Sequence, residues 1–598
     1  MSRFYHFFNS ILSNRQKSYL LAIFVLLLIG GGFEVIGIGI ILPYLALLMN
    51  PSSVTHHHLI APIYHFLVTH QIIASQTQFL ILITGTIILI YWLKNSYFIL
   101  NQRFQANFVY ELYRTIATKL FRFYLTEDYK NHLDRNTGTL IRNINQLTLD
   151  LITIFLLPFL MLVSEVFIVL LLLVFLLYVN PLSTLYVFVL LGSMVSIIFM
   201  MTRKKIQAMG AKVADHQTSA NRQVLHGLGS FKTTTLLQKQ EFFVSHYNDA
   251  VEHLSENRKS FEVMQNMPRF LMETAIVTVM LSLALIMLWR GRTNGELILM
   301  LSLFGMAGMR LLPSMNRILN SMNAIKYSKA MIEELLVDLL KIPQQQDQLV
   351  NKPQDSIIFD NIRLERVDFS YGDKLTLKDI NLTICAGQSV GFVGHSGSGK
   401  STLIDVILGL LSPSRGKIML NDKNIEDILP SWQKSIGYIP QDIYLTDESI
   451  KANIAFGVEP SQIDEKQLAN VIKVAQLESL INELPEGVNT EIGERGVKLS
   501  GGQRQRIGIA RALYHNPQVI VMDEATAALD NVTERAFMDA VNGLKGQKTL
   551  IMIAHRLTTV ENCDVIYFME KGKIVDKGTF QELNSSNMKF KNLASKLN

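Results

Sequence analysis

The sequence predicts an α-helical membrane domain with six spans, followed by an α/β domain built around a phosphate-binding loop. Three observations support this fold class. The chain has 598 residues, which is too long for one hydrophobic core. Hydrophobic residues make up 49% of it and charged residues only 18%, and the apolar excess lies almost entirely in the first half. The second half has an ordinary composition and contains the run Gly394-His-Ser-Gly-Ser-Gly-Lys-Ser401.

Six apolar segments of the first half are long enough to cross a membrane, which takes about 20 residues. Their approximate bounds are 19–48, 78–100, 151–178, 183–201, 270–289 and 296–316. The first segment is too long to be a cleaved signal peptide. Lysine and arginine gather before the first span and after the second and fourth, whereas residues 50–77 contain neither. Because cationic loops stay on the cytoplasmic side, we expect both termini in the cytoplasm. Arg290 and Arg292, in a short outer loop, are the exception.

The first outer loop has a helical apolar pattern. Ile60, Ile63, Tyr64 and Leu67 fall on one face of a helix. This spacing fits a short helix at the membrane surface, and it fits a helix packed on neighbouring spans equally well. The three histidines at 56–58 could bind a metal, but a solvated loop is the commoner meaning of such a run.

The two inner connections, about 101–150 and 202–268, are charged and poor in proline and glycine. We therefore expect them to continue the spanning helices into the cytoplasm. Each connection must turn back near its midpoint, where it could contact a cytoplasmic domain. The expected turning points are Asp128 to Arg135 and Ala214 to Gln223.

Charged residues inside membrane spans are costly, so each is a candidate for function. The residues inside the expected spans that we single out are Glu34, Glu165, Glu273 and Arg310. Arg310 stands among apolar neighbours, and it either contacts a substrate or forms an ion pair with one of the glutamates. Arg103 and Arg269 lie near span ends, where snorkelling to the interface is the simpler explanation.

The phosphate loop has the flanking structure that its motif requires. The apolar run 389–393 precedes it as a strand, and residues 402–411 follow as a helix. Its glycines allow backbone conformations in which successive amides point at phosphate oxygens, at a helix N-terminus that favours an anion. Lys400 would reach the β and γ phosphates of a nucleotide, and the Ser401 hydroxyl would coordinate Mg²⁺.

The membrane domain is expected to cover residues 1–326 and a linker residues 327–355. The second domain then covers 356–598, with strands expected at 356–359 and 377–384. Further motifs follow the phosphate loop in a fixed order. They are Gln441 after Ile-Pro, Leu499-Ser-Gly-Gly-Gln503 opening a helix, Val519 to Asp523 with Glu524, Asp530, and the strand 550–554 ending at His555.

This order of motifs resembles the ATP-binding-cassette (ABC) family, and Leu-Ser-Gly-Gly-Gln is that family's signature. The membrane half resembles the six-span exporter type, fused ahead of its ATPase. The resemblance implies an ATPase coupled to transmembrane transport, with ATP and Mg²⁺ as cofactors. Thr490 to Gly496, just before the signature, is similar to a segment of exporters and supports the export direction.

The resemblance also implies a role for each motif residue. Ser401 is the direct Mg²⁺ ligand, and Gln441 and Asp523 help to hold the ion and its waters. Glu524 polarises the attacking water, and His555 holds the γ-phosphate and links it to Glu524. The residues expected to contact ATP are Tyr371, Gly394, His395, Ser396, Gly397, Ser398, Gly399, Lys400, Ser401, Thr402, Gln441, Leu499, Ser500, Gly501, Gly502, Gln503 and Asp530.

In the family the signature caps the γ-phosphate of a partner's ATP. The chain has one phosphate loop and one signature, so we expect a homodimer with twelve spans. No active-site position is degenerate, which makes a heterodimer the weaker alternative. The soluble cassette ATPases of DNA repair are excluded by the spans, and no nucleic-acid partner is expected.

Parts of the membrane half resemble the lipid-linked oligosaccharide flippases of the PglK type. These parts are residues 33–43, 132–136, 140–145 and 310–320. The resemblance implies a multi-pass protein of the bacterial cytoplasmic (inner) membrane that flips a lipid-linked oligosaccharide. The candidate substrate residues are Arg310, Arg269, Arg103 and Glu34. A drug, lipid or peptide exporter of the same architecture is the alternative.

Overall fold

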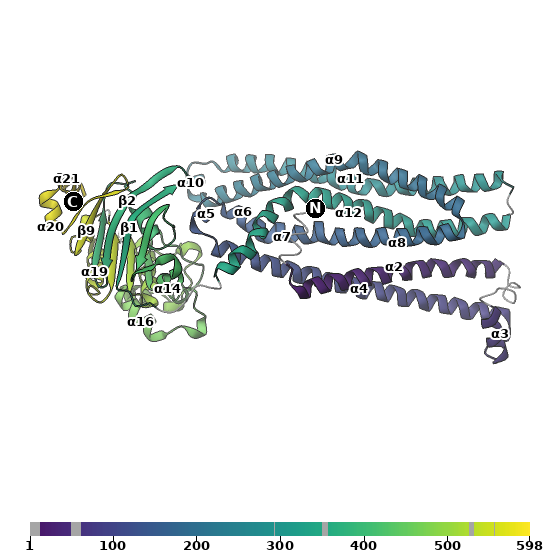
Figure 1. Cartoon of the computed structure of the whole chain (residues 1–598), viewed down its shortest axis with the longest axis horizontal. Helices are drawn as coiled ribbons and strands as arrows, with labels where there is room; N and C mark the ends of the chain where they lie inside the picture. Colours follow the sequence, from purple (N-terminus) through teal and green to yellow (C-terminus); the bar gives the residue numbers. More distant parts are fainter. Residues whose placement is uncertain are drawn as a thin grey trace. The chain divides into compact units, whose positions relative to one another are not determined.

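The computed structural model describes residues 12–49, 61–291, 294–349, 357–525, 531–554 and 556–597. The chain forms two compact units (Figure 1). The first unit consists of Met1–Glu127 and Asp134–Gln346, and the second of Asp128–Leu133 and Asp347–Asn598.

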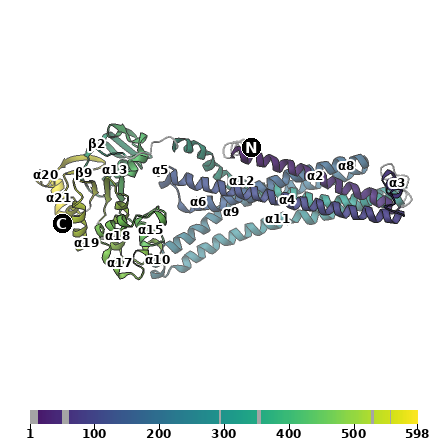
Figure 2. The same cartoon turned by 90° about the horizontal axis from the view of Figure 1, so that it is seen from below.

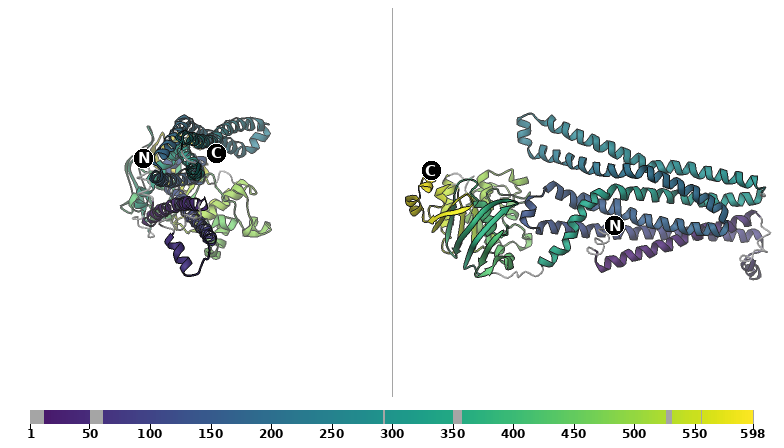
Figure 3. Two further views of the ribbon diagram at one scale, coloured as in Figure 1. Left: turned by 90° about the vertical axis from the view of Figure 1, so that its right-hand side faces the viewer. Right: turned by 45° about the horizontal axis from the view of Figure 1, so that its top comes forward.

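Long helices make up the first unit (Figures 1 and 2). They are α2 (Asn14–Met49), α4 (Gln76–Thr126), α8 (Leu157–Val179), α9 (Pro181–Gly229), α11 (Gln240–Trp289) and α12 (Asn294–Leu349). Helices α9 and α11 lie side by side, and α2 packs against both α4 and α8 (Figure 3). Among the described residues, five helices are long and apolar enough to cross a membrane. The sixth expected span, 296–316, lies within α12 and stays a prediction.

The first inner turn lies where the sequence predicts it. Helix α4 ends at Thr126, and the short helix α5 (Tyr129–Leu133) follows. The second predicted turn, Ala214 to Gln223, is wrong because this stretch lies inside α9. It contains no glycine or proline to end a helix. The chain turns instead after Gly229, around the short helix α10 (Phe231–Leu236).

The outer-loop helix α3 (Ala61–Thr69) uses one face for packing. Tyr64 and Leu67 pack against a small apolar cluster that contains Phe79. Ile63 and Phe66 are 56% and 57% exposed, so a second face stays open in the single chain. The packed face agrees with the second alternative, and a position at the membrane surface stays a prediction. Ile60 and the three histidines at 56–58 lie outside the described residues.

Ahead of α8 the helical path is irregular. Helix α6 (Thr137–Arg142) runs into a π-helical segment, Asn143–Leu147, then α7 (Thr148–Asp150), then a second π-helical segment, Leu151–Leu156. Such segments are rare and frequently mark functional sites.

The first unit continues past the expected start of the linker at 327. The α12 side chains of Tyr327, Ile332, Leu335 and Leu339 are buried in a core with residues of α4 and of 140–160. The compact units divide after Gln346.

The second unit contains two sheets within the described residues. In the larger sheet the strand order is β10-β9-β3-β8-β7-β6, and every pairing is parallel except that of β10 with β9. Its strands are β3 (Ser389–Val393), β6 (Ile436–Ile439), β7 (Val519–Asp523), β8 (Thr549–Ile553), β9 (Val565–Glu570) and β10 (Lys573–Gly578).

The smaller sheet is antiparallel, in the order β2-β1-β4-β5. Its strands are β1 (Asn361–Tyr371), β2 (Lys374–Cys385), β4 (Arg415–Leu420) and β5 (Lys423–Asn424). The strand expected at 356–359 is wrong for its described residues, 357–359, which precede β1. Their backbone uses side-chain partners instead of a strand ladder, since the Phe359 amide donates to Gln518 Oε1 at 2.8 Å.

Helices pack around these sheets. They are α13 (Lys400–Ile407), α14 (Leu429–Lys434), α15 (Ile450–Ile454), α16 (Glu465–Val474), α17 (Glu478–Glu483), α18 (Gly501–Tyr514), α19 (Asn531–Asn542), α20 (Phe580–Ser586) and α21 (Met588–Leu597). Helix α5 also belongs to this unit. Its Tyr129 packs against the core of the smaller sheet, and the Lys130 ammonium lies 5.8 Å from the centre of the Phe369 ring. This segment of the first inner connection thus clusters with the second compact unit.

Candidate functional site

The phosphate loop joins β3 to α13. All five residues of β3 are buried, which fixes the start of the loop in the centre of the larger sheet. Gly397 and Gly399 have φ values of +77° and +100°, in the left-handed region that glycine enters most easily. A Cβ on Gly394 would lie 2.3 Å from the Met569 carbonyl oxygen. Residues 394–399 therefore hold a conformation that requires these glycines, and Lys400, Ser401 and Thr402 form the first turn of α13.

The loop folds around the ammonium of Lys400. This side chain is buried, and its Nζ donates to the carbonyl oxygens of Gly394 at 2.8 Å and His395 at 3.2 Å. Burial lowers the pKa of Lys400, and the nearby Glu524 and Asp523 carboxylates oppose that shift. The Ser398 hydroxyl is also buried and has no hydrogen-bond partner among the described residues. A buried cation and an unsatisfied hydroxyl inside a loop of amides fit the phosphates of a nucleotide.

Carboxylates gather at the same edge of the larger sheet. Asp523 ends β7, which pairs in parallel with β8 so that Asp523 lies opposite Ile553. Glu524 follows with a left-handed φ of +51°, and its Oε2 accepts a hydrogen bond from Gln441 Nε2 at 2.8 Å. In such sheets, ligands bind outside the carboxyl ends of the parallel strands. The strands β3, β6 and β7 all end at this edge. The structure thus brings Lys400, Gln441, Asp523 and Glu524 to one edge.

The signature residues open a different helix, α18 (Figure 2). Ser500 is its N-cap, and the Ser500 Oγ accepts from the Gln503 amide at 3.2 Å. The Gln503 side chain accepts in return from the Ser500 amide at 2.8 Å. This reciprocal pair is a capping box. It holds Gly501 and Gly502 in the first turn, where backbone amides at a helix N-terminus can receive an anion. Leu499 is buried and anchors the segment.

Three predicted residues of the second unit need separate mention. Tyr371 ends β1, is 37% exposed and meets Phe369 edge to face at 4.9 Å between ring centroids. One side of its ring is therefore packed while part stays accessible. Asp530 and His555 lie outside the described residues.

The first unit contains a cluster of charges from four helices. We call Glu34, Lys94, Glu165, Arg310 and Arg317 the membrane charge cluster. Glu34 Oε2 lies 3.1 Å from Lys94 Nζ and 3.1 Å from Arg310 Nε. Glu165 Oε2 lies 3.8 Å from Arg310 Nη2, and its Oε1 lies 2.6 Å from Arg317 Nε. Arg310 therefore forms ion pairs with two glutamates, which is one of the two alternatives expected from the sequence. Three cations against two carboxylates leave the cluster with one positive charge.

The other charges singled out from the sequence lie outside this cluster. Arg103, Arg269 and Glu273 are exposed in the single chain. For the two arginines this fits the expected snorkelling to the interface.

Lys94 and Arg317 are cluster members that the sequence reasoning missed. Lys94 lies inside the expected span 78–100, so the rule applied to Glu34 would have found it. Arg317 follows Arg310 by seven residues, which is two helical turns and hence the same face of α12.

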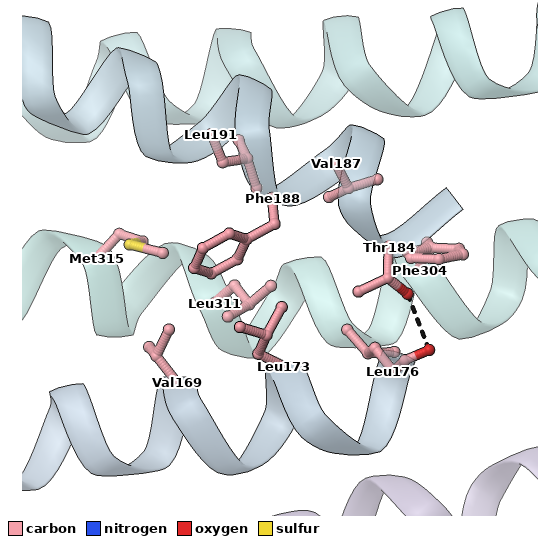
Figure 4. A pocket seen from close by; sticks show the side chains of 10 residues that line it. All are labelled: Val169, Leu173, Leu176, Thr184, Val187, Phe188, Leu191, Phe304, Leu311 and Met315. Atoms are coloured by element: carbon pink, nitrogen blue, oxygen red, sulfur yellow. Dashed lines mark hydrogen bonds between the residues drawn. The ribbon is translucent and has the colours of Figure 1, made fainter. Parts of the chain in front are cut away.

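A small cavity between α8, α9 and α12 is a packing gap. Its lining is apolar, with Val169, Phe188 and Leu311 among the side chains (Figure 4). The Thr184 hydroxyl donates to the Leu176 carbonyl oxygen at 2.8 Å. A volume of about 20 Å³ is close to that of one water and holds no ligand.

Comparison with known proteins connects both units to one group. Residues 377–527 match the family model described as ABC transporter. The ATP-dependent lipid A-core flippase of Cupriavidus pinatubonensis is 31% identical over 442 residues, which cover 72% of this chain and 73% of the relative. A protein of Staphylococcus aureus, named for multidrug export and as an ATP-binding/permease protein, is 43% identical over 237 residues. That alignment covers 39% of this chain and 41% of the relative.

A solved structure shares the fold over nearly the whole chain. It is a bacterial Atm1-family ABC exporter with ATP bound, with a TM-score of 0.74 and 20% sequence identity. The match covers 98% of this chain and 99% of that chain.

Proposed function

The chain belongs to the ABC transporter family and is an exporter-type half-transporter, and from this premise we propose that it flips a lipid-linked oligosaccharide across the bacterial cytoplasmic membrane. Family membership makes it an integral membrane protein whose ATP hydrolysis is coupled to export. The lipid-linked oligosaccharide, the inner membrane and cytoplasmic termini are our proposals.

We assign the ATP chemistry to the carboxyl edge of the larger sheet. Ser401, Gln441 and Asp523 would hold Mg²⁺, which takes few protein ligands and keeps several waters. Glu524, whose carboxylate accepts a hydrogen bond from Gln441, would orient and polarise the attacking water. His555 would hold the γ-phosphate. The fit rests on the donor set, since a hydroxyl, an amide and a carboxylate are oxygen ligands of the kind Mg²⁺ prefers.

We further propose that two copies of the chain form the working transporter. The signature of one copy would cap the ATP held by the phosphate loop of the other. Its two anion-receiving features, the α18 N-terminus and the loop before α13, begin different helices. In the proposed dimer the two features of different copies would face one nucleotide. This arrangement gives twelve spans and two composite sites.

The membrane charge cluster carries the substrate proposal. Its net positive charge lies among apolar helices, where charge that is not fully compensated is costly. An anionic headgroup, such as a pyrophosphate that joins lipid to glycan, would neutralise that charge. Arg310 is 18% exposed and Arg317 41%, so Arg317 offers the more open contact.

Export of a drug or another lipid is the second candidate. It is favoured by the name of the Staphylococcus relative and by the name lipid A-core flippase of the Cupriavidus relative. A neutral drug would not need the excess positive charge of the cluster.

The test measures ATPase activity of the chain reconstituted in liposomes. We expect a polyprenyl pyrophosphate that carries a glycan to raise the rate above the basal rate. Arg317→Gln should reduce that stimulation several-fold, whereas Arg222→Gln, an exposed change on α9, should leave it intact. Equal stimulation of both variants, or stimulation by neutral drugs alone, would contradict the proposal.

A further inference from the structure

A large cavity with both polar and apolar walls lies in the first unit, away from the membrane charge cluster. Its volume is about 810 Å³, within the range of about 300–1,000 Å³ typical of ligand sites. Its walls come from residues 138–154, from α9 near 213–225, from α11 near 258–265 and from α12 at 327 and 334. The α9 wall begins about 12 residues after the expected span 183–201, so the cavity belongs to the inner helical extensions.

Five side-chain amides contribute to the polar lining. They are Asn145, Gln146, Gln217, Asn221 and Gln265. Each amide offers two donors and an acceptor with two lone pairs. Some are already aligned, because Gln217 Nε2 donates to Asn221 Oδ1 at 3.2 Å and Gln217 Oε1 accepts from Arg258 at 3.3 Å. Asn145, Gln146 and Asn221 are exposed and can exchange water for a ligand.

Charge in the lining is nearly balanced. Arg142 and Arg258 stand against Asp150, Glu262 and Glu334. A phosphate site would carry an excess of cations. Apolar side chains such as Ile154, Val213 and Leu225 stand between the polar groups of this lining, as is usual for ligand sites. Mixed donors and acceptors without a large net charge match sugar hydroxyls, which donate and accept at once.

The cavity has a fixed polar anchor. Arg142, whose side chain is only 10% exposed, donates to Thr218 at 2.6 Å and to Glu334 at 2.5 Å, and so ties α6 to α9 and α12. Its Nε is buried with no hydrogen-bond partner among the described residues. The π-helical segment 143–147 follows it directly and contributes Asn145 and Gln146 to the lining. Phe261 and Tyr327 stack at 4.2 Å beside these groups and offer an apolar face.

The spacing along α12 connects the cavity to the membrane charge cluster. Tyr327 in the cavity wall follows Arg317 of the cluster by ten residues on this continuous helix. At 1.5 Å per residue the two lie about 15 Å apart along the axis. This separation lets a lipid-linked glycan with its pyrophosphate at Arg317 reach the cavity with its sugars.

We propose that this cavity binds the glycan of the transported lipid, as a subsite separate from the one that receives the charged linkage. The inference rests on the proposed function. It predicts that the transporter distinguishes a glycan-bearing lipid from the same lipid without sugar, and that the amides at 145 and 221 make this distinction.

The test uses the full chain in liposomes and two probes. One is a polyprenyl pyrophosphate linked to chitobiose, and the other is the same polyprenyl pyrophosphate without sugar. We expect the double variant Asn145→Ala/Asn221→Ala to raise the half-maximal concentration of the glycan probe for ATPase stimulation about tenfold, as expected for two lost hydrogen bonds. The half-maximal concentration of the bare probe should change by less than about twofold, because this probe has no sugar to form these hydrogen bonds. Asn221→Trp, which puts a larger side chain in the cavity lining, should have a similar selective effect.

Gln207→Ala is the matched control, because Gln207 is exposed on the same α9 and lies outside the cavity lining. Its response to both probes should equal that of the unmodified chain. A second pair of probes, lipid A with and without its core sugars, distinguishes a glycolipid source of the glycan from a polyprenyl source.

Each outcome has one meaning. Selective loss of the glycan response supports the subsite. A glycan response that stays unchanged in the double variant overturns the subsite and leaves the proposed function standing. Equal shifts for both probes overturn it as well. If no glycan-bearing lipid stimulates the unmodified chain, the proposed function fails, and the inference fails with it.

Discussion

Replacing Arg310 with glutamine tests the membrane charge cluster most sharply. Arg310 lies 3.1 Å from Glu34 Oε2 and 3.8 Å from Glu165 Oε2, and the three side chains are only 10–18% exposed. Removing one partner of a buried ion pair costs about 3–5 kcal/mol, because it leaves a carboxylate uncompensated. Here each glutamate keeps one other cation, Lys94 or Arg317. We therefore expect the low end of that range, about 3 kcal/mol.

The assay is thermal unfolding of the purified chain in detergent. A loss of about 3 kcal/mol corresponds to a decrease in Tm of roughly 6–12 °C for a domain of 150–250 residues. Arg222→Gln, exposed on α9, should stay within about 0.5 kcal/mol of the unmodified chain.

A double-mutant cycle with Glu34→Gln separates the ion pair from general damage. The double variant should be more stable than the sum of the single effects predicts, by about 1–3 kcal/mol. Strictly additive losses, or an Arg310→Gln variant as stable as Arg222→Gln, would refute the reasoning that these charges stabilise one another.

The remaining predictions concern the second unit. Glu524→Gln should keep ATP binding and lose hydrolysis, at least about a hundredfold as for removal of a general base; near-normal phosphate release would exclude this role. Lys400→Ala and Ser500→Arg chains should each be inactive as pure dimers, and a mixture should recover at most one working site per dimer; full activity of a monomer would contradict the shared sites. The pKa of Asp405 is raised to about 6, first by burial and second by the Asp523 carboxylate. Its charged form is therefore disfavoured in the fold, so this group destabilises the chain progressively from about pH 4 to pH 6 and fully above that. Asp405→Asn should raise Tm at pH 7.5 and leave it nearly unchanged at pH 4, and an equal change at both pH values would disagree with this linkage.

The ATP-binding unit could be predicted largely from local sequence. The buried run 389–393, the phosphate loop and the helix after it are neighbours in the chain, so their spacing alone determines their arrangement. The strand ending at Asp523 is likewise an uninterrupted apolar run. The expected strand at 356–359 failed because its described residues bond to the side chains of distant residues, a tertiary effect with no local pattern.

The membrane unit shows what the sequence could not supply. The long inner helices follow from composition, but the turning point predicted at 214–223 is wrong. The chain turns after Gly229, a glycine near the midpoint of this connection that the prediction did not use. The ion pairs of Arg310 with two glutamates depend on how three helices, α2, α8 and α12, are rotated. Periodicity does not fix these rotations when the helices are apolar nearly all round. The large cavity of the first unit is lined in part by the π-helical segments around 143–156, which no local sequence pattern predicts.

The most direct test of the account is ATP-driven translocation. The chain is reconstituted in liposomes with a fluorescent polyprenyl-pyrophosphate-linked oligosaccharide, and an added quencher of the label reports the leaflet in which the glycan lies. We predict that ATP with Mg²⁺ moves the glycan away from the side of the ATPase units, and that Glu524→Gln abolishes this movement. Glycan that stays in place while ATP is hydrolysed, or that moves equally in the Glu524→Gln chain, would contradict the proposal.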